Sequence, residues 1–297
     1  MTTTNAPPAA GMQIGVTGVM LPELDFAEQM ALCRELGVTH YSLRPRPIPE
    51  DQIGKPWGNW GNHKWDLTPE RLLKQAPHIR KQMSDYGVTP FGTVPAIMVT
   101  EPDDAMKLHF DGAAAAGAGR VRVQPYAYPQ DRPFDYAELL KRTVDRYGQL
   151  VEIARRAGNV KMVIETHSCS FAASPGVARN IVQHFDPKDV GVIFDLANYA
   201  IEGNLRPSLA VAVLRDWIDH CHVGGVRRTP GKYDAFGFRE PASQMCPLTE
   251  SDLHLPAYFA ALRDADVRVP LVMENYTENI TGAERLRESA AALKRLM

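Results

Sequence analysis

The sequence is poor in cysteine and contains no long hydrophobic run. Its four cysteines are scattered through 297 residues without a CxxC pair. Such spacing is typical of free thiols in a reducing compartment, so we expect a cytoplasmic protein. No stretch approaches the roughly 18 apolar residues of a membrane span, so no membrane partner is expected. The opening MTTTNAPPAAG lacks the basic and apolar parts of a signal peptide, and we expect residues 1–11 to form a flexible tail.

The sequence also lacks an excess of charge of either sign. It has 33 basic and 35 acidic residues, which gives a formal net charge of −2. A nucleic-acid-binding protein usually carries a basic face or stripe, so this balance argues against a nucleic-acid partner. No Walker-type phosphate loop is present either. With 44% hydrophobic and 23% charged residues, the composition is that of an ordinary soluble globular protein.

What the sequence does contain is a regular alternation of short β-type segments and longer helical ones. Strands are predicted at 13–18, 39–44, 90–96, 120–125, 161–167, 190–196, 219–225 and 270–276. Helices are predicted at 23–36, 69–86, 102–117, 135–157, 175–185, 206–218, 251–265 and 281–296. Eight such units predict a closed (β/α)8 TIM barrel. An open doubly wound sheet is the alternative, but nothing in the composition marks a second domain, so we expect one barrel domain over residues 12–297.

The last four predicted strands each end in a residue that can bind a metal ion. These residues are Glu165, Asp195, His222 and Glu274. A single acid at a strand end is more often a helix N-cap or a surface charge, but four in succession are hard to assign to chance. In a closed barrel these ends meet at one mouth, where three carboxylates would repel one another without a cation. The oxygen-rich set favours Mn²⁺, with Mg²⁺ or Co²⁺ as alternatives.

Two connections, 45–67 and 226–250, are unusually long. Both follow predicted strands, so both are expected on the barrel face that carries active sites. The first contains three tryptophans within nine residues, interleaved with amides. Aromatic rings pack on the C–H faces of sugars and amides bind hydroxyls, so Trp60 and His63 are predicted to contact a small-molecule sugar or glycoside. The alternative is that one or two of the tryptophans only anchor the loop.

At this point the chain resembles the xylose isomerase-like TIM barrels, the sugar phosphate isomerase/epimerase superfamily, over most of its length. The segment HCHVGGVRR is similar to the seventh-strand signature of ketose 3-epimerases, His-x-His-x-Gly followed by an arginine. The resemblance implies that the four strand-end residues bind the metal and that Arg228 donates hydrogen bonds to the substrate. The segment DLANYAIEG resembles a further epimerase segment, but Asn198 stands where the epimerases have a substrate-contacting histidine. By that match Asn198 is expected to contact the substrate.

His167 lies two residues beyond Glu165, so both side chains are predicted to face the barrel interior. An imidazole there is either a polar residue at the rim or a general base that titrates near neutrality. The chain looks similar here to the metal-binding subunit of C-glycoside deglycosidases, in which a histidine after the fifth-strand glutamate abstracts a proton next to a ketone. The resemblance implies a carbon–carbon lyase acting on a 3-oxo-glycoside, with His167, Glu165 and Glu274 as catalytic residues. It also implies an oligomer, either of this chain alone or together with a smaller second subunit.

Three alternative functions remain open. The first is a metal-dependent ketose or sugar isomerase, or a 3-epimerase, that acts through an enediolate. The second is an abasic-site endonuclease, which shares the fold but requires a basic face and further zinc-binding histidines. The third is a sugar-binding subunit without catalysis, partnered through 226–250. An intact set of four metal-binding residues favours an enzyme over this last alternative.

Overall fold

Eight parallel strands close into a barrel in the computed structural model, which describes residues 11–203 and 206–297. Around the barrel the strands follow the order β1-β10-β7-β6-β5-β4-β3-β2. The strands are β1 (Ile14–Thr17), β2 (His40–Leu43), β3 (Thr89–Thr93), β4 (Arg120–Arg122), β5 (Lys161–Glu165), β6 (Val190–Asp195), β7 (Ile218–Val223) and β10 (Leu271–Met273). Each lies within or beside a predicted strand, so the predicted (β/α)8 barrel is confirmed.

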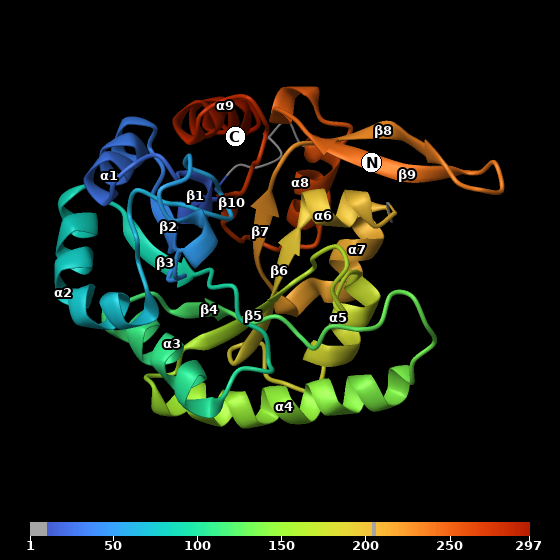
Figure 1. Cartoon of the computed structure of the whole chain (residues 1–297), viewed down its shortest axis with the longest axis horizontal. Helices are drawn as coiled ribbons and strands as arrows, with labels where there is room; N and C mark the ends of the chain where they lie inside the picture. Colours follow the sequence, from blue (N-terminus) through green and yellow to red (C-terminus); the bar gives the residue numbers. More distant parts are fainter. Residues whose placement is uncertain (1–10, 204–205) are drawn as a thin grey trace.

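Helices surround the barrel on its outside (Figure 1). They are α1 (Phe26–Glu35), α2 (Pro69–Asp85), α3 (Asp103–Ala116), α4 (Tyr136–Arg156), α5 (Pro175–Val182), α7 (Pro207–Leu214), α8 (Leu255–Asp264) and α9 (Gly282–Lys294). Their starts follow from the sequence. Thr68 caps α2 ahead of a proline, and Ser174 caps α5 in the same way. A short helix that the sequence did not predict, α6 (Leu196–Ile201), directly follows β6.

The strands are buried because helices cover the outside of the barrel and side chains fill its interior. All six residues of β6, VGVIFD, are buried, as expected for a parallel strand covered on both faces. The hydrogen-bond register places Asp195 on β6 opposite His222 on β7, and His222 opposite Val272 on β10. The register therefore keeps the carboxyl ends of these strands at nearly the same height.

The segment 226–250, predicted as a long connection, contains a β-hairpin instead. Its strands β8 (Val226–Tyr233) and β9 (Arg239–Met245) pair antiparallel and extend away from the barrel (Figure 1, orange). Pro230 lies opposite Pro241 in the hairpin, and prolines within both strands concealed it in the sequence. The hairpin changes the direction of the chain directly after β7, which moves the side chains of 227–245 away from the barrel axis.

Short 3-10 helices occur at Gly18–Met20 (η1), Glu50–Gln52 (η2), Arg215–Trp217 (η3) and Leu248–Glu250 (η4). Within the described ranges no helix is long and apolar enough to cross a membrane. The predicted tail at residues 1–11 lies outside the described residues except for Gly11, which is an exposed turn residue.

Candidate metal centre

Three carboxylates and one imidazole from four neighbouring strands meet at the mouth of the barrel. They form what we call the carboxylate–histidine cluster: Glu165, Asp195, His222 and Glu274. Each residue offers one ligand atom, and these atoms all lie within 4.8 Å of one another. All four side chains are buried. The sequence placed these residues at strand ends, and the structure brings them together.

Asp195 has two structural roles, since it also caps helix α6. Its Oδ1 accepts a hydrogen bond from the backbone N–H of Asn198 at 2.7 Å, while Oδ2 lies 3.7 Å from Nδ1 of His222. The backbone N–H of Asp195 donates to the hydroxyl of Thr166, which fixes the end of β6 against β5. An acid at the first turn of a helix is favourable electrostatically. The N-cap and metal-ligand interpretations of this residue are therefore compatible.

His222 is surrounded by the carboxylates of the cluster. Its Nδ1 lies 2.8 Å from Oε1 of Glu165 and also forms an ion pair with Glu274. Burial alone would lower the pKa of His222, but Glu274, Asp195 and Glu165 raise it well above its usual value. In the metal-free protein a proton on His222 therefore offsets part of the negative charge.

Two residues of the fourth strand and its end hold Glu165 in place, and sequence reasoning missed both. Arg122 donates a hydrogen bond to Oε2 of Glu165 at 2.6 Å, and Gln124 donates to the same oxygen at 3.2 Å. Burial raises the pKa of Glu165, but Arg122 and His222 outweigh it and hold that pKa well below its usual value. The opposite oxygen, Oε1, is thereby directed toward the cluster. The segment RVRVQ could have indicated them, because polar residues alternate with valine there. On a strand of a closed barrel such alternation directs one set of side chains into the barrel.

Glu274 is held by an aromatic residue just beyond its strand. The hydroxyl of Tyr276 donates to Oε1 of Glu274 at 2.6 Å. The ring of Tyr276 contacts Trp60 of the 45–67 connection, with 4.8 Å between ring centroids. Burial, followed by the neighbouring Glu274 carboxylate, raises the pKa of Tyr276 well above its usual value, so the phenol stays protonated and donates. The long first connection thus reaches the metal centre through Tyr276.

The donor set fits a divalent cation. Three carboxylate oxygens and one imidazole nitrogen within 4.8 Å of one another match the ligands that hard or borderline divalent ions bind. Burial raises the pKa of Asp195 above its usual value, and the nearby carboxylate of Glu165 adds to the rise. A cation would remove this repulsion. The cluster can therefore hold a divalent metal ion.

A model of xylose isomerase-like TIM barrels matches residues 30–296 of the chain. The chain belongs to this family. No curated protein sequence matches it. Among solved structures, the 3-keto-D-glucoside 4-epimerase from E. coli is 16% identical with a TM-score of 0.67, and the match covers 96% of this chain and 99% of that chain.

Two further solved structures resemble this xylose isomerase-like barrel. The D-psicose 3-epimerase from Clostridium cellulolyticum H10, solved with D-tagatose, is 13% identical with a TM-score of 0.67, and the match covers 96% of this chain and 98% of that chain. The IOLI protein, solved with a zinc atom, is 15% identical with a TM-score of 0.71, and the match covers 96% of this chain and 98% of that chain. At these identities the likeness shows a shared fold.

Asn198 on α6 binds the loop after β5 that carries His167 in this xylose isomerase-like barrel. Nδ1 of His167 lies 2.7 Å from the carbonyl oxygen of Ser168. The side-chain oxygen of Asn198 accepts hydrogen bonds from the backbone N–H of Ser168 at 3.2 Å and from its hydroxyl at 2.8 Å. Glu202, the residue directly after α6, accepts from the N–H of Cys169, whose φ of 61° is left-handed. Asn198, predicted to contact substrate, thus binds the loop that carries His167.

The predicted sugar-binding residues of the first long connection differ in their surroundings. Trp60 is 54% exposed, whereas Trp65 stacks on Phe26 with 4.1 Å between ring centroids and anchors the loop. His63 is buried and its Nε2 lies 3.1 Å from the carbonyl oxygen of Asn59. Burial and the neighbouring arginines lower the pKa of His63 to about 3, so this imidazole is neutral near pH 7.

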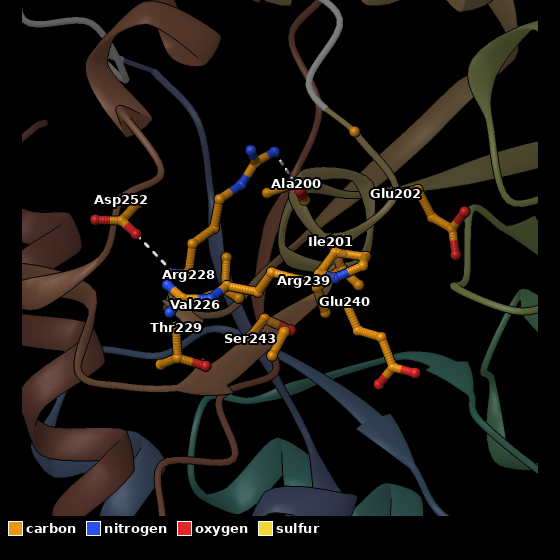
Figure 2. Close-up of a pocket in the computed structure, with 13 residues that line it drawn as sticks. Ala200, Ile201, Glu202, Val226, Arg228, Thr229, Arg239, Glu240, Ser243 and Asp252 are labelled. Carbon is orange, nitrogen blue, oxygen red and sulfur yellow. Dashed lines mark hydrogen bonds between the residues drawn. The ribbon is translucent and has the colours of Figure 1, made fainter. Parts of the chain in front are cut away.

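Arg228 lies near the start of strand β8 and is exposed. Its side chain reaches the carbonyl oxygen of Ala200, and its backbone N–H donates to Asp252 (Figure 2). It lines a cavity of about 760 Å³ between the end of α6 and the β8–β9 hairpin. Among the described residues that line this cavity there is no member of the cluster. Arg228 thus borders this cavity, and its contact with a substrate stays a prediction.

Proposed function

We propose that the chain is a metal-dependent enzyme that removes a proton next to the carbonyl group of an oxidised sugar, and that β-elimination follows. In this proposal it is a C-glycoside deglycosidase-like carbon–carbon lyase acting on a 3-oxo-glycoside. The observation that carries the proposal is the buried carboxylate–histidine cluster with His167 two residues beyond one of its members. The similarity to a 3-keto-D-glucoside 4-epimerase supports an oxidised sugar as the substrate.

The carboxylate–histidine cluster would hold the metal ion, for which its oxygen-rich donors favour Mn²⁺ over Mg²⁺ or Co²⁺. When bound, a divalent cation supplies a Lewis acid that polarises a carbonyl group. Arg122 and Gln124 direct one oxygen of Glu165 toward this position, and Tyr276 does the same for Glu274. The side chains that would bind the ion are thus fixed before it arrives.

His167 is proposed as the base. The carbonyl oxygen of Ser168 can only accept a hydrogen bond, so Nδ1 of His167 carries a hydrogen, and in the neutral imidazole Nε2 would hold the lone pair. Nε2 would take the proton from the carbon next to the carbonyl group. The C–H electrons form a C=C bond, the bond to the β substituent breaks, and the leaving group departs with the electron pair and takes up the proton that His167 removed. Trp60, His63, Arg228 and Asn198 stay predicted substrate contacts, and Trp60 is linked to Glu274 through Tyr276.

The second candidate is a metal-dependent ketose or sugar isomerase, or a 3-epimerase. Glu165 ends strand β5 and Glu274 directly follows strand β10, and these two strands are separated around the barrel by β6 and β7. Two carboxylates that approach a substrate carbon from different sides suit removal and return of a proton on opposite faces. Asn198 favours the lyase, because its side-chain oxygen is occupied by Ser168 and the epimerase histidine is absent. We also expect an oligomer, with or without a smaller second subunit.

The test is turnover of a 3-oxo-glycoside by the metal-loaded protein. We expect release of the aglycone, and we expect His167→Ala to abolish this release while metal content and melting temperature stay those of the wild type. His184→Ala, at an exposed histidine on the outside of the barrel, is the matched control and should retain activity. Deuterium wash-in at a free ketose, with epimer formation and no aglycone release from any oxidised glycoside, would replace the lyase by the isomerase.

A further inference from the structure

Two arginines that the proposed reaction does not use follow strand β2 at the mouth of the barrel. Arg44 is only 3% exposed, and its Nη1 donates a hydrogen bond to the carbonyl oxygen of Arg46 at 3.2 Å. Its other donors, Nε and Nη2, are buried and have no hydrogen-bond acceptor among the described residues. Nε of Arg46 is in the same situation. Buried donors without acceptors reduce the stability of the fold, so these nitrogens indicate a site for a hydrogen-bond acceptor.

Neither arginine has a carboxylate partner. Within the described parts of the chain no acidic oxygen lies within ion-pair distance of either guanidinium group, and Asp66, the acid that interacts most with Arg44, pairs with Arg71 instead. Burial and the positive charge of Arg46 lower the pKa of Arg44 to about 10. A buried cation is normally paired. The positive charges of the two guanidinium groups therefore repel each other.

Arg46 lies beside the metal centre. Its guanidinium carbon is 5.7 Å from the ring centroid of Trp60, which contacts Tyr276, whose hydroxyl donates to Glu274. Arg46 also interacts electrostatically with Glu165 and Glu274, although it forms no ion pair with them. The unpaired positive charge therefore borders the space in which a substrate at the metal centre would lie.

The charge balance of the loaded site points to an anionic ligand. Glu165, Asp195 and Glu274 carry three negative charges, which a divalent cation and the guanidinium of Arg122 neutralise. The charges of Arg44 and Arg46 are then left over. We infer that Arg44 and Arg46 bind an anionic group of the substrate, a carboxylate or a phosphate, beside the metal centre.

The donors suit such a group, because guanidinium forks bind carboxylates and phosphates with two parallel hydrogen bonds. Trp60 offers an exposed ring face next to Arg46 for the body of a sugar. This assignment deepens the proposed function, on which it rests for the sugar, by making the substrate an acidic sugar or a sugar phosphate. A lyase or isomerase acting on a neutral glycoside would leave both arginines unexplained.

The test is binding of three small probes to the metal-loaded, full-length protein by titration calorimetry: D-glucuronate, D-glucose 6-phosphate and neutral D-glucose. We expect one of the two anionic sugars to bind about 10- to 100-fold more tightly than D-glucose, and which one it is distinguishes carboxylate from phosphate. Arg46→Gln should remove that advantage, and Arg46→Lys should restore part of it. Arg34→Gln is the matched control, since Arg34 also lies over an aromatic ring, 4.5 Å from the centroid of Tyr86, but on helix α1.

Three results would overturn the inference: no binding of either anionic sugar, equal binding of all three probes, or an equal loss for neutral and anionic probes in Arg46→Gln. Because Arg44 is buried, Arg44→Met tests it separately through melting temperature. We expect no loss of stability in Arg44→Met, since an unpaired charge is replaced by an apolar chain, and a large loss would make Arg44 structural. Binding is measured without turnover, so the anion site can stand if the lyase and isomerase assignments both fail.

Discussion

Replacing Glu274 by glutamine tests whether the carboxylate–histidine cluster binds metal. A ligand that binds only the folded state stabilises it by about 2.7 kcal/mol at 100 times its Kd. For 297 residues the unfolding entropy is about 0.6 kcal/mol/K, so the wild type should gain about 4 °C in Tm at that metal concentration. Loss of a partner that only orients a metal ligand already weakens binding about 10- to 100-fold, and loss of a ligand charge should weaken it at least as much.

At the same metal concentration Glu274→Gln would then be near its own Kd. The remaining stabilisation is about 0.4 kcal/mol, which is a shift of less than about 1 °C. The metal-free variant should lose only a few degrees, because a glutamine oxygen can still accept the hydrogen bond of Tyr276. Some loss is expected, since His222 and Arg122 together outweigh burial and hold the pKa of Glu274 below its usual value, so the ionised carboxylate stabilises the metal-free fold at neutral pH.

The assay is differential scanning fluorimetry with and without Mn²⁺, Mg²⁺ or Co²⁺ after chelator treatment. Glu278→Gln is the matched control, since Glu278 is an exposed glutamate four residues further along the same segment. It should keep the full metal-dependent shift. An equal shift in Glu274→Gln and Glu278→Gln, or no shift of the wild type with any divalent ion, would refute the assignment of the cluster as a metal site.

Three other predictions concern the proton, the loop and the hairpin. The pKa of His222 lies well above its usual value, so His222 is cationic near pH 7. Metal binding should therefore release about one proton and weaken as pH falls. Calorimetry in two buffers of different ionisation enthalpy measures the proton release. Asn198→Ala removes both hydrogen bonds to Ser168 and should lower kcat about tenfold or more, whereas metal affinity and Tm should change little. A Cβ at Gly225 would come within 2.1 Å of the carbonyl oxygen of Cys246. Gly225→Ala should therefore lower the stability by about 1–3 kcal/mol, or roughly 2–5 °C in Tm. An unchanged Tm would show that the backbone at the base of the hairpin shifts to make room for the methyl group.

The barrel and the location of its centre were predictable because both follow from patterns local in the sequence. A buried strand is a short apolar run, and a titratable residue at its end, such as Glu165 after MVI, is visible without knowledge of the fold. Strict alternation then implies a closed barrel, which places all strand ends at one mouth. The structure has the eight barrel strands at these positions.

The contacts around the cluster were not predictable, since they join residues far apart in the sequence. Arg122 binds Glu165 across 43 positions, and only the pairing of β4 with β5 brings the two together. The contact of Arg228 with the carbonyl oxygen of Ala200 was not predictable either, since the spacing of a motif does not give the direction of the chain after Gly225, where the hairpin begins. The sequence does not mark Arg44 as a binding residue, because an arginine after a strand is common. Its lack of a hydrogen-bond acceptor is visible only in the folded structure.

The double use of Asp195 limits how this protein can diverge or be redesigned. A glutamate would supply the same ligand atom, but its longer side chain would not suit the short contact by which Asp195 caps α6. Asn198 and Glu202, which hold the loop of His167, are both carried by that helix segment. A change of ligand at this one position would therefore alter the metal site and the alignment of the proposed base together. Transfer of the centre to another barrel would require the segment 195–202 to be moved as a unit.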